Sequence, residues 1–173
     1  MKLNKRLPIL IFCALLAAMT MVFKRFAIFN IDWLRFSLEN TPILMAGIFF
    51  GPVAGLATGA VGDILGCFYC GFGINPVITL GAALVGGLSG LIYKYILPKL
   101  PELARLISAV YVAHIIGNMF VKSIGIYWWY GTPLPTLILR IPTFLIIGAV
   151  EIVLLRILLS NRTFRKQLQK LNG

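Results

Sequence analysis

Three polar side chains recur at every fourth position within an otherwise apolar stretch: His114, Asn118 and Lys122. This spacing places them on one face of a helix. Together, an imidazole, an amide and an ammonium can donate and accept hydrogen bonds and can bind an anion. Because polar groups in an apolar helix usually face a cavity or a neighbouring helix, the pattern indicates either a solute-binding wall or interhelical hydrogen bonds. Lys122 lies near the end of the stretch, where its ammonium could instead reach the membrane surface.

A second apolar stretch contains two charged residues about three helical turns apart, Arg140 and Glu151. The guanidinium of Arg140 has a planar fork of donors that matches a ligand carboxylate. Glu151 lies deeper in the stretch. We interpret it as structural, paired with a neighbouring helix or with Arg156.

Asp63 allows two interpretations of equal weight. Its carboxylate could accept hydrogen bonds from the amino and ring N–H groups of a heterocycle. It could equally neutralise Arg25 or Arg35, which flank a polar segment between two apolar stretches.

The sequence excludes several kinds of catalytic and metal site. It contains no G-x-x-x-x-G-K-[ST] nucleotide loop, no serine in a nucleophile-elbow context and no cluster of metal ligands, so we predict no metal and no cofactor. Cys67 and Cys70 have the spacing of a redox pair but lack its strand-to-helix context. Two half-buried thiols at a helix end are the simpler interpretation. A membrane thiol oxidoreductase is the alternative from a different functional class.

The elements that must position these residues are membrane helices. Apolar residues make up 60% of the 173 residues and charged residues only 12%, which is far from the composition of a soluble domain. Since about 20 apolar residues span a bilayer, we predict an all-α bundle of six transmembrane helices that forms one domain over residues 1–173. The predicted spans cover approximately residues 7–23, 42–50, 53–68, 76–97, 103–127 and 137–159.

Glycine is concentrated in one region, with twelve of the 17 glycines between positions 47 and 90. Gly47, Gly51, Gly55 and Gly59 recur every fourth residue, and Pro52 predicts a break within this series. Stripes of small residues let membrane helices approach closely. We therefore predict tightly packed helices on both sides of the break.

The distribution of basic residues predicts the orientation in the membrane. Of the 16 basic residues, eleven fall on the side of the two termini, which places both termini in the cytoplasm by the positive-inside rule. The net charge of +11 does not predict nucleic-acid binding, because the charges cluster at helix ends. The outer side still carries five basic residues and all three tryptophans. An anionic, aromatic solute would explain them, and so would contacts with lipid headgroups.

Several motifs resemble those of a known family. They are L-R-F-S at 34–37, P-I-L-M-A-G at 42–47, F-G-P-V-A-G at 50–55, G-D-I-L-G at 62–66 and I-N-P-V-I-T-L-G at 74–81. With the length and the span pattern, they resemble the S component, the substrate-binding subunit, of energy-coupling factor (ECF) vitamin transporters. The last motif and the basic outer face resemble the folate-specific branch, and an S component for another vitamin is the alternative.

The resemblance implies a function and partners. An S component is not an enzyme. It captures its vitamin outside a prokaryotic cell membrane, associates with a membrane T component and two cytoplasmic ATPase subunits, and tilts in the bilayer to deliver the solute. In this family a small-residue pair on the first span contacts the T component, and Ala14 and Ala18 match its position.

Folate chemistry suits the candidate residues. A flat pterin could stack on Trp33, Phe36 or Trp128, and Asn75, Asn118 or His114 could read its polar edge. The two carboxylates of the glutamate moiety could bind cationic side chains. The candidates for that role are Arg25, Arg35, Lys122 and Arg140.

Overall fold

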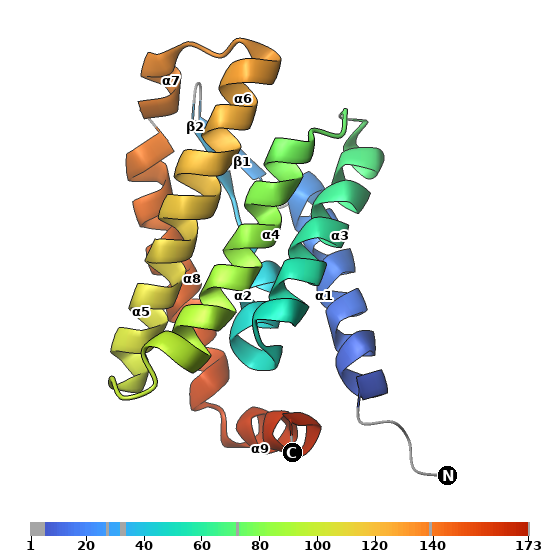
Figure 1. Ribbon diagram of the computed structural model, residues 1–173, viewed down its shortest axis with the longest axis vertical. Helices are drawn as coiled ribbons and strands as arrows, with labels where there is room; N and C mark the ends of the chain where they lie inside the picture. Colours follow the sequence, from blue (N-terminus) through green and yellow to red (C-terminus); the bar gives the residue numbers. More distant parts are fainter. Residues whose placement is uncertain (1–5, 27, 32–33, 72, 139, 173) are drawn as a thin grey trace.

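The computed structural model describes residues 6–26, 28–31, 34–71, 73–138 and 140–172. Five stretches of helix are long and apolar enough to cross a membrane. They are α1 (Arg6–Phe26), α3 (Pro52–Cys70), α4 (Pro76–Leu91) continued by the π-helix η1 (Ile92–Ile96), α5 (Glu102–Ala113) continued by the π-helix η2 (His114–Lys122) and by α6 (Ser123–Tyr130), and α8 (Arg140–Ser160). They run roughly side by side as a bundle (Figure 1).

The second predicted span is a shorter element. Helix α2 (Asn40–Phe50) has 11 residues and is about 16 Å long, roughly half the thickness of the hydrocarbon core. Its side chains are nonetheless the most deeply buried of the fold. Ile43, Leu44 and Ile48 belong to one hydrophobic cluster with buried residues of α4, α5 and α8 at the centre of the bundle. Helix α2 is therefore a core helix within a fold that has five candidate spans, so the predicted number of six is not confirmed.

The polar segment predicted as a loop between the first two spans contains a β-hairpin, which corrects the purely helical prediction. Strands β1 (Ile28–Ile31) and β2 (Leu34–Ser37) pair antiparallel, with Ile28 opposite Ser37 and Ile31 opposite Leu34. Strand β1 is rich in β-branched and aromatic residues, β2 contributes Phe36, and two residues separate the strands, which is a common hairpin spacing. The hairpin lies at the end of the bundle away from both termini (Figure 1).

The glycine-rich region packs as predicted. Gly55 on α3 and Gly86 on α4 face each other so closely that a Cβ on either would overlap the backbone of the other. The predicted break is also present, because α2 ends at Phe50, α3 begins at Pro52, and Gly51 has a φ of 105° that favours glycine. This close packing holds α3 and α4 in the positions that the site requires.

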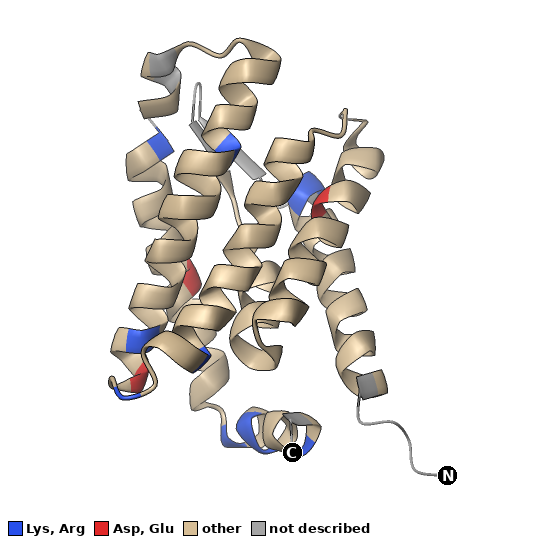
Figure 2. Ribbon diagram, in the orientation of Figure 1, with Lys and Arg blue, Asp and Glu red and all other residues tan. Residues whose placement is uncertain are grey.

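The basic segment that follows the last predicted span forms a further helix. Helix α9 (Arg162–Asn172) crosses the end of the bundle near both termini, and Phe164 and Leu168 pack against the core. Its basic residues add to the positive charge at this end (Figure 2). The one short helix not yet described, α7 (Leu134–Ile138), lies at the opposite end of the bundle and connects α6 to α8.

Candidate functional site

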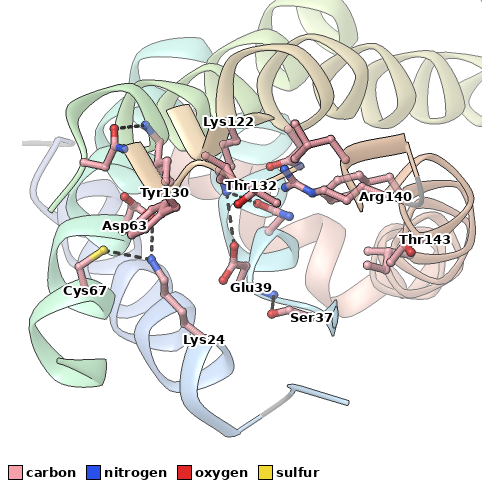
Figure 3. Close-up of a pocket in the computed structure, with 18 of the residues that line it drawn as sticks. Lys24, Ser37, Glu39, Asp63, Cys67, Lys122, Tyr130, Thr132, Arg140 and Thr143 are labelled. Carbon is pink, nitrogen blue, oxygen red and sulfur yellow. Dashed lines mark hydrogen bonds and ion pairs between the residues drawn. The ribbon is translucent and has the colours of Figure 1, made fainter. Parts of the chain in front are cut away.

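A cavity of about 430 Å³ is lined by residues from the half of the bundle that lies away from α9. Figure 3 shows the cavity in close-up. Its volume lies within the range of sites that take a drug-sized ligand. Its wall combines residues from β2, from η2, and from the helices α1, α2, α3, α4, α6, α7 and α8. The polar lining residues are Lys24, Ser37, Glu39, Asn40, Asp63, Asn75, Asn118, Lys122, Thr132, Arg140 and Thr143. The other lining residues are Cys67, Gly73, Ile78, Ile126, Tyr130, Leu137, Phe144 and Ile147.

One side of the cavity is built around a buried ion pair. The Nζ of Lys24 lies 2.7 Å from Oδ1 of Asp63 (Figure 3). The hydroxyl of Thr79 donates to Oδ2 of the same carboxylate at 2.8 Å. The ammonium of Lys24 also lies 3.4 Å from the sulfur of Cys67. Asp63 therefore neutralises Lys24, whereas Arg25, one of the two partners that the sequence suggested, is exposed. The side chain of Arg35, the other suggested partner, lies outside the described part of the chain.

A second ion pair joins η2 to the segment before α2. The Nζ of Lys122 donates to Oε1 of Glu39 at 3.4 Å and to Oδ1 of Asn40 at 3.5 Å. Lys122 is buried, so its ammonium does not extend to a membrane surface in this fold. This ion pair connects the N-terminus of α2 to η2 in the cavity wall.

The third cation of the wall is Arg140, at the start of α8. One guanidinium nitrogen donates to the hydroxyl of Ser123 at 2.9 Å, and the guanidinium lies over the ring of Phe144. Among the described lining residues, three cations face two carboxylates, which leaves one net positive charge. The cavity is therefore suited to a ligand that carries a carboxylate.

Behind the wall lies a fully buried chain of hydrogen bonds. Nε2 of His114 contacts Oε2 of Glu151 at 2.5 Å, and the amide nitrogen of Asn118 contacts Nδ1 of His114 at 2.6 Å. The hydroxyl of Thr41 donates to the other carboxylate oxygen of Glu151 at 3.2 Å. Glu151 is therefore paired with a neighbouring helix, as one of our two interpretations has it, and Arg156 is not that partner.

The polar stripe of the sequence coincides with η2. His114, Asn118 and Lys122 are the first, fifth and ninth residues of this π-helix. A π-helix is wider than an α-helix and is frequently found at functional sites. Asn118 and Lys122 line the cavity, while His114 lies behind the wall in contact with the amide of Asn118.

Asn75 has a structural task in addition to its place on the cavity wall. Its Oδ1 accepts from the backbone N–H groups of Val77 and Ile78, which caps α4, and its Nδ2 donates to the carbonyl of Gly125. These bonds occupy most of the amide's capacity for reading a ligand.

The remaining predicted residues do not all converge on the cavity. Arg25 is exposed, and Trp128 is 80% exposed on an open apolar surface beside the bundle, so neither lines the cavity. Phe36 is half-buried in β2 and is not among the lining residues. Trp33 lies outside the described residues, and of Arg35 the structure describes only the backbone in β2.

Sequence reasoning missed several residues of the wall. Lys24 and Glu39 line the cavity, but neither is among the binding residues that we predict from the sequence. Tyr130 and Phe144 supply aromatic surface that we expect from the sequence at Trp33, Phe36 or Trp128. No spacing rule distinguishes Lys24 from Arg25, because both follow the same apolar run.

The predicted docking and redox residues have simple surroundings. Ala14 and Ala18 lie on the exposed face of α1, beside exposed Leu15 and Met19, so they do not pack inside the described bundle. Cys67 and Cys70 are both free thiols, one buried and one half-buried. In the described part of the chain, no three His, Cys, Asp or Glu residues gather as a metal site.

Comparisons with known proteins find the transporter family whose motifs the sequence resembles. A family model described as "ECF-type riboflavin transporter, S component" matches residues 6–165. The curated protein "Folate transporter FolT" of Clostridium novyi (strain NT) is 27% identical over 121 residues, which cover 69% of each chain.

Three solved structures resemble this one. FolT bound with folic acid has a TM-score of 0.68 at 25% identity and covers 82% of this chain and 86% of its own. The S component of a bacterial ECF transporter has a TM-score of 0.65 at 25% identity, covering 97% and 99%. An S component for biotin has a TM-score of 0.69, covering 93% and 95%, and at 20% identity it supports the fold alone.

Proposed function

Because the chain belongs to the family of ECF-type riboflavin transporter S components, we propose that it is the folate-binding subunit of an ATP-driven vitamin uptake transporter. The family consists of substrate-binding transporter subunits, not enzymes, so the thiol oxidoreductase interpretation of Cys67 and Cys70 is abandoned. The protein is a multi-pass membrane protein.

The observation that carries the folate proposal is the composition of the cavity wall. Folate combines a flat pterin, an aromatic linker and a glutamate with two carboxylates. Tyr130 and Phe144 offer aromatic surface, Asn118 offers an amide, and the wall has one net positive charge that includes Arg140. The similarity to FolT bound with folic acid supports the same ligand.

Riboflavin is the second candidate, because the matching family model is described by that vitamin. Riboflavin has a flat ring system but no carboxylate. It would therefore offer no anionic group to the cationic side chains of the wall, whereas folate offers two carboxylates. This argument favours folate over riboflavin.

We predict that the purified chain binds folate with a stoichiometry near one to one and without ATP. The experiment is isothermal titration of the protein in detergent with folate, riboflavin and biotin in parallel. Saturable heat with folate alone is the expected result. Tight binding of riboflavin or biotin without folate binding would reject the vitamin assignment and leave the family intact.

For the membrane orientation, we propose six helices that include α2, with both termini in the cytoplasm and the cavity facing outward. The basic residues around α9 and the terminal end of the bundle support this orientation. In the proposed cycle, the protein captures folate outside a prokaryotic cell, associates with a T component and two cytoplasmic ATPases, and tilts to release the vitamin inward.

The exposed face of α1 is the proposed contact with the T component. We predict that replacing Ala14 and Ala18 with leucine blocks folate uptake by cells that contain the whole transporter, because bulky side chains prevent close helix approach. Folate affinity of the isolated protein should stay unchanged, since both residues lie outside the cavity. A matched control replaces Leu15, a large residue already exposed on α1, with isoleucine. Normal uptake by the alanine variants would disprove the docking role.

A further inference from the structure

We propose that His114 and Glu151 act as positioning residues that hold Asn118 with its side-chain carbonyl oxygen toward the ligand. Asn118 then accepts a hydrogen bond from an N–H group of the ligand's heterocycle. The inference rests on the proposed function, because it assigns one polar contact of the heterocycle within the proposed vitamin site.

The orientation of Asn118 follows from its contact with the imidazole. The amide nitrogen of Asn118 lies 2.6 Å from Nδ1 of His114. An amide nitrogen only donates, so Nδ1 must be the unprotonated, accepting nitrogen of the ring. The proton of a neutral imidazole is then on Nε2, which lies 2.5 Å from the carboxylate of Glu151 and donates to it.

Glu151 is held in turn by a residue of the core helix. The hydroxyl of Thr41 on α2 donates to its second oxygen, and Glu151 is completely buried. The carboxylate therefore has a fixed position from which it keeps the proton on Nε2. A carboxylate that fixes the tautomer and the ring orientation of a histidine is a familiar arrangement behind ligand sites.

The side-chain carbonyl oxygen of Asn118 ends this series of hydrogen bonds. It is buried and has no hydrogen-bond partner among the described residues, while Asn118 itself contributes to the cavity wall. A buried acceptor without a partner is unfavourable, because its loss of water is not offset by a new hydrogen bond. A ligand N–H group at this position would supply the missing bond. The pterin of folate carries such groups on its amino substituent and its ring.

The proton of His114 determines which ligand group is accepted. If Nδ1 carried a proton, the amide of Asn118 would have to turn and present its NH₂ group, and the site would then select an acceptor on the ligand. The positions of His114 and Glu151 thus specify a donor without either residue touching the ligand.

The tautomer can be measured directly, because His114 is the only histidine in the sequence. We expect ¹⁵N NMR of the full chain, labelled at histidine and without ligand, to show a protonated Nε2 and an unprotonated Nδ1. A proton on Nδ1, in either the other neutral tautomer or an imidazolium, would overturn the proposal. This measurement uses the unaltered protein, so it does not depend on whether a variant folds.

Binding measurements test the consequence for the ligand. Glu151→Gln keeps the size of the side chain, but the new amide can donate to Nε2 of His114 as well as accept from it. Either tautomer of His114 is then possible, so the amide of Asn118 is no longer fixed in one orientation. We expect a mixture of tautomers in the NMR spectrum and about tenfold weaker binding of folate. A pterin fragment without glutamate should lose affinity by the same factor, because only the heterocycle is affected. Asn118→Leu, which has no acceptor, should weaken both ligands at least as much.

The matched control is Glu102→Gln, the same substitution at an exposed carboxylate that pairs with Arg165 far from the cavity. It should leave both affinities unchanged. Unchanged affinity of Glu151→Gln for both ligands would also overturn the proposal. If the unaltered protein binds no folate, the proposed function fails, and the tautomer of His114 still decides the orientation of Asn118.

Discussion

Replacing Asp63 with asparagine is expected to lower the free energy of unfolding by about 3–5 kcal/mol. The change removes the negative charge that lies 2.7 Å from the Nζ of Lys24, while both side chains remain less than one-tenth exposed. The ammonium of Lys24 would then be buried without a counter-charge, which is far more costly than the loss of the hydrogen bond alone. Denaturant unfolding of the ligand-free protein in detergent measures the effect.

An exposed pair of similar geometry provides the control. Nη2 of Arg165 lies 2.6 Å from Oε2 of Glu102, but the two side chains are 50% and 42% exposed. Glu102→Gln should therefore change the unfolding free energy by less than about 1 kcal/mol. Combining Asp63→Asn with Lys24→Met should recover much of the lost stability, because no buried charge remains. Equal changes in the free energy of unfolding at the two pairs would show that the burial of Lys24 does not determine the cost of losing Asp63.

Replacing Arg140 with glutamine is expected to weaken folate binding by about 2–5 kcal/mol, or roughly 30- to 4,000-fold. The guanidinium lies on the cavity wall, where it is held by Ser123 and lies over Phe144. Its removal would leave a carboxylate of the ligand buried without its cation. Isothermal titration with folate, and with a pterin fragment that lacks the glutamate, measures the loss. The fragment should bind almost as well as before, because it carries no carboxylate.

The matched control for Arg140 is Arg25→Gln. Arg25 is exposed and lies outside the cavity, so its substitution should leave folate affinity nearly unchanged. The sequence offered both arginines as partners for the carboxylates, and of the two only Arg140 lies on the cavity wall. If Arg25→Gln weakens folate binding more than Arg140→Gln, the cavity is not the site that binds the carboxylates.

The local sequence was sufficient for most of the helices and for part of the site. Apolar runs predicted the five long stretches, and Gly51-Pro52 predicted the break between α2 and α3, because these signals act within a few residues. The polar stripe of His114, Asn118 and Lys122 correctly identified one face of one helix. The hairpin was missed because its two strands of four residues each are too short to show a clear alternation.

The pairings were decided by the tertiary structure. Lys24 and Asp63 are 39 positions apart, His114 and Glu151 are 37 apart, and Lys122 bonds Glu39 across 83 positions. The sequence by itself determined that apolar helices carry a few buried polar groups, since periodicity and hydropathy are local properties. Which charge meets which depends on how closely two distant helices approach. That approach is set by glycine contacts, such as Gly55 against Gly86, and by the wider π-helical turn of η2. Local spacing does not show which glycine faces which, or which helix η2 packs against.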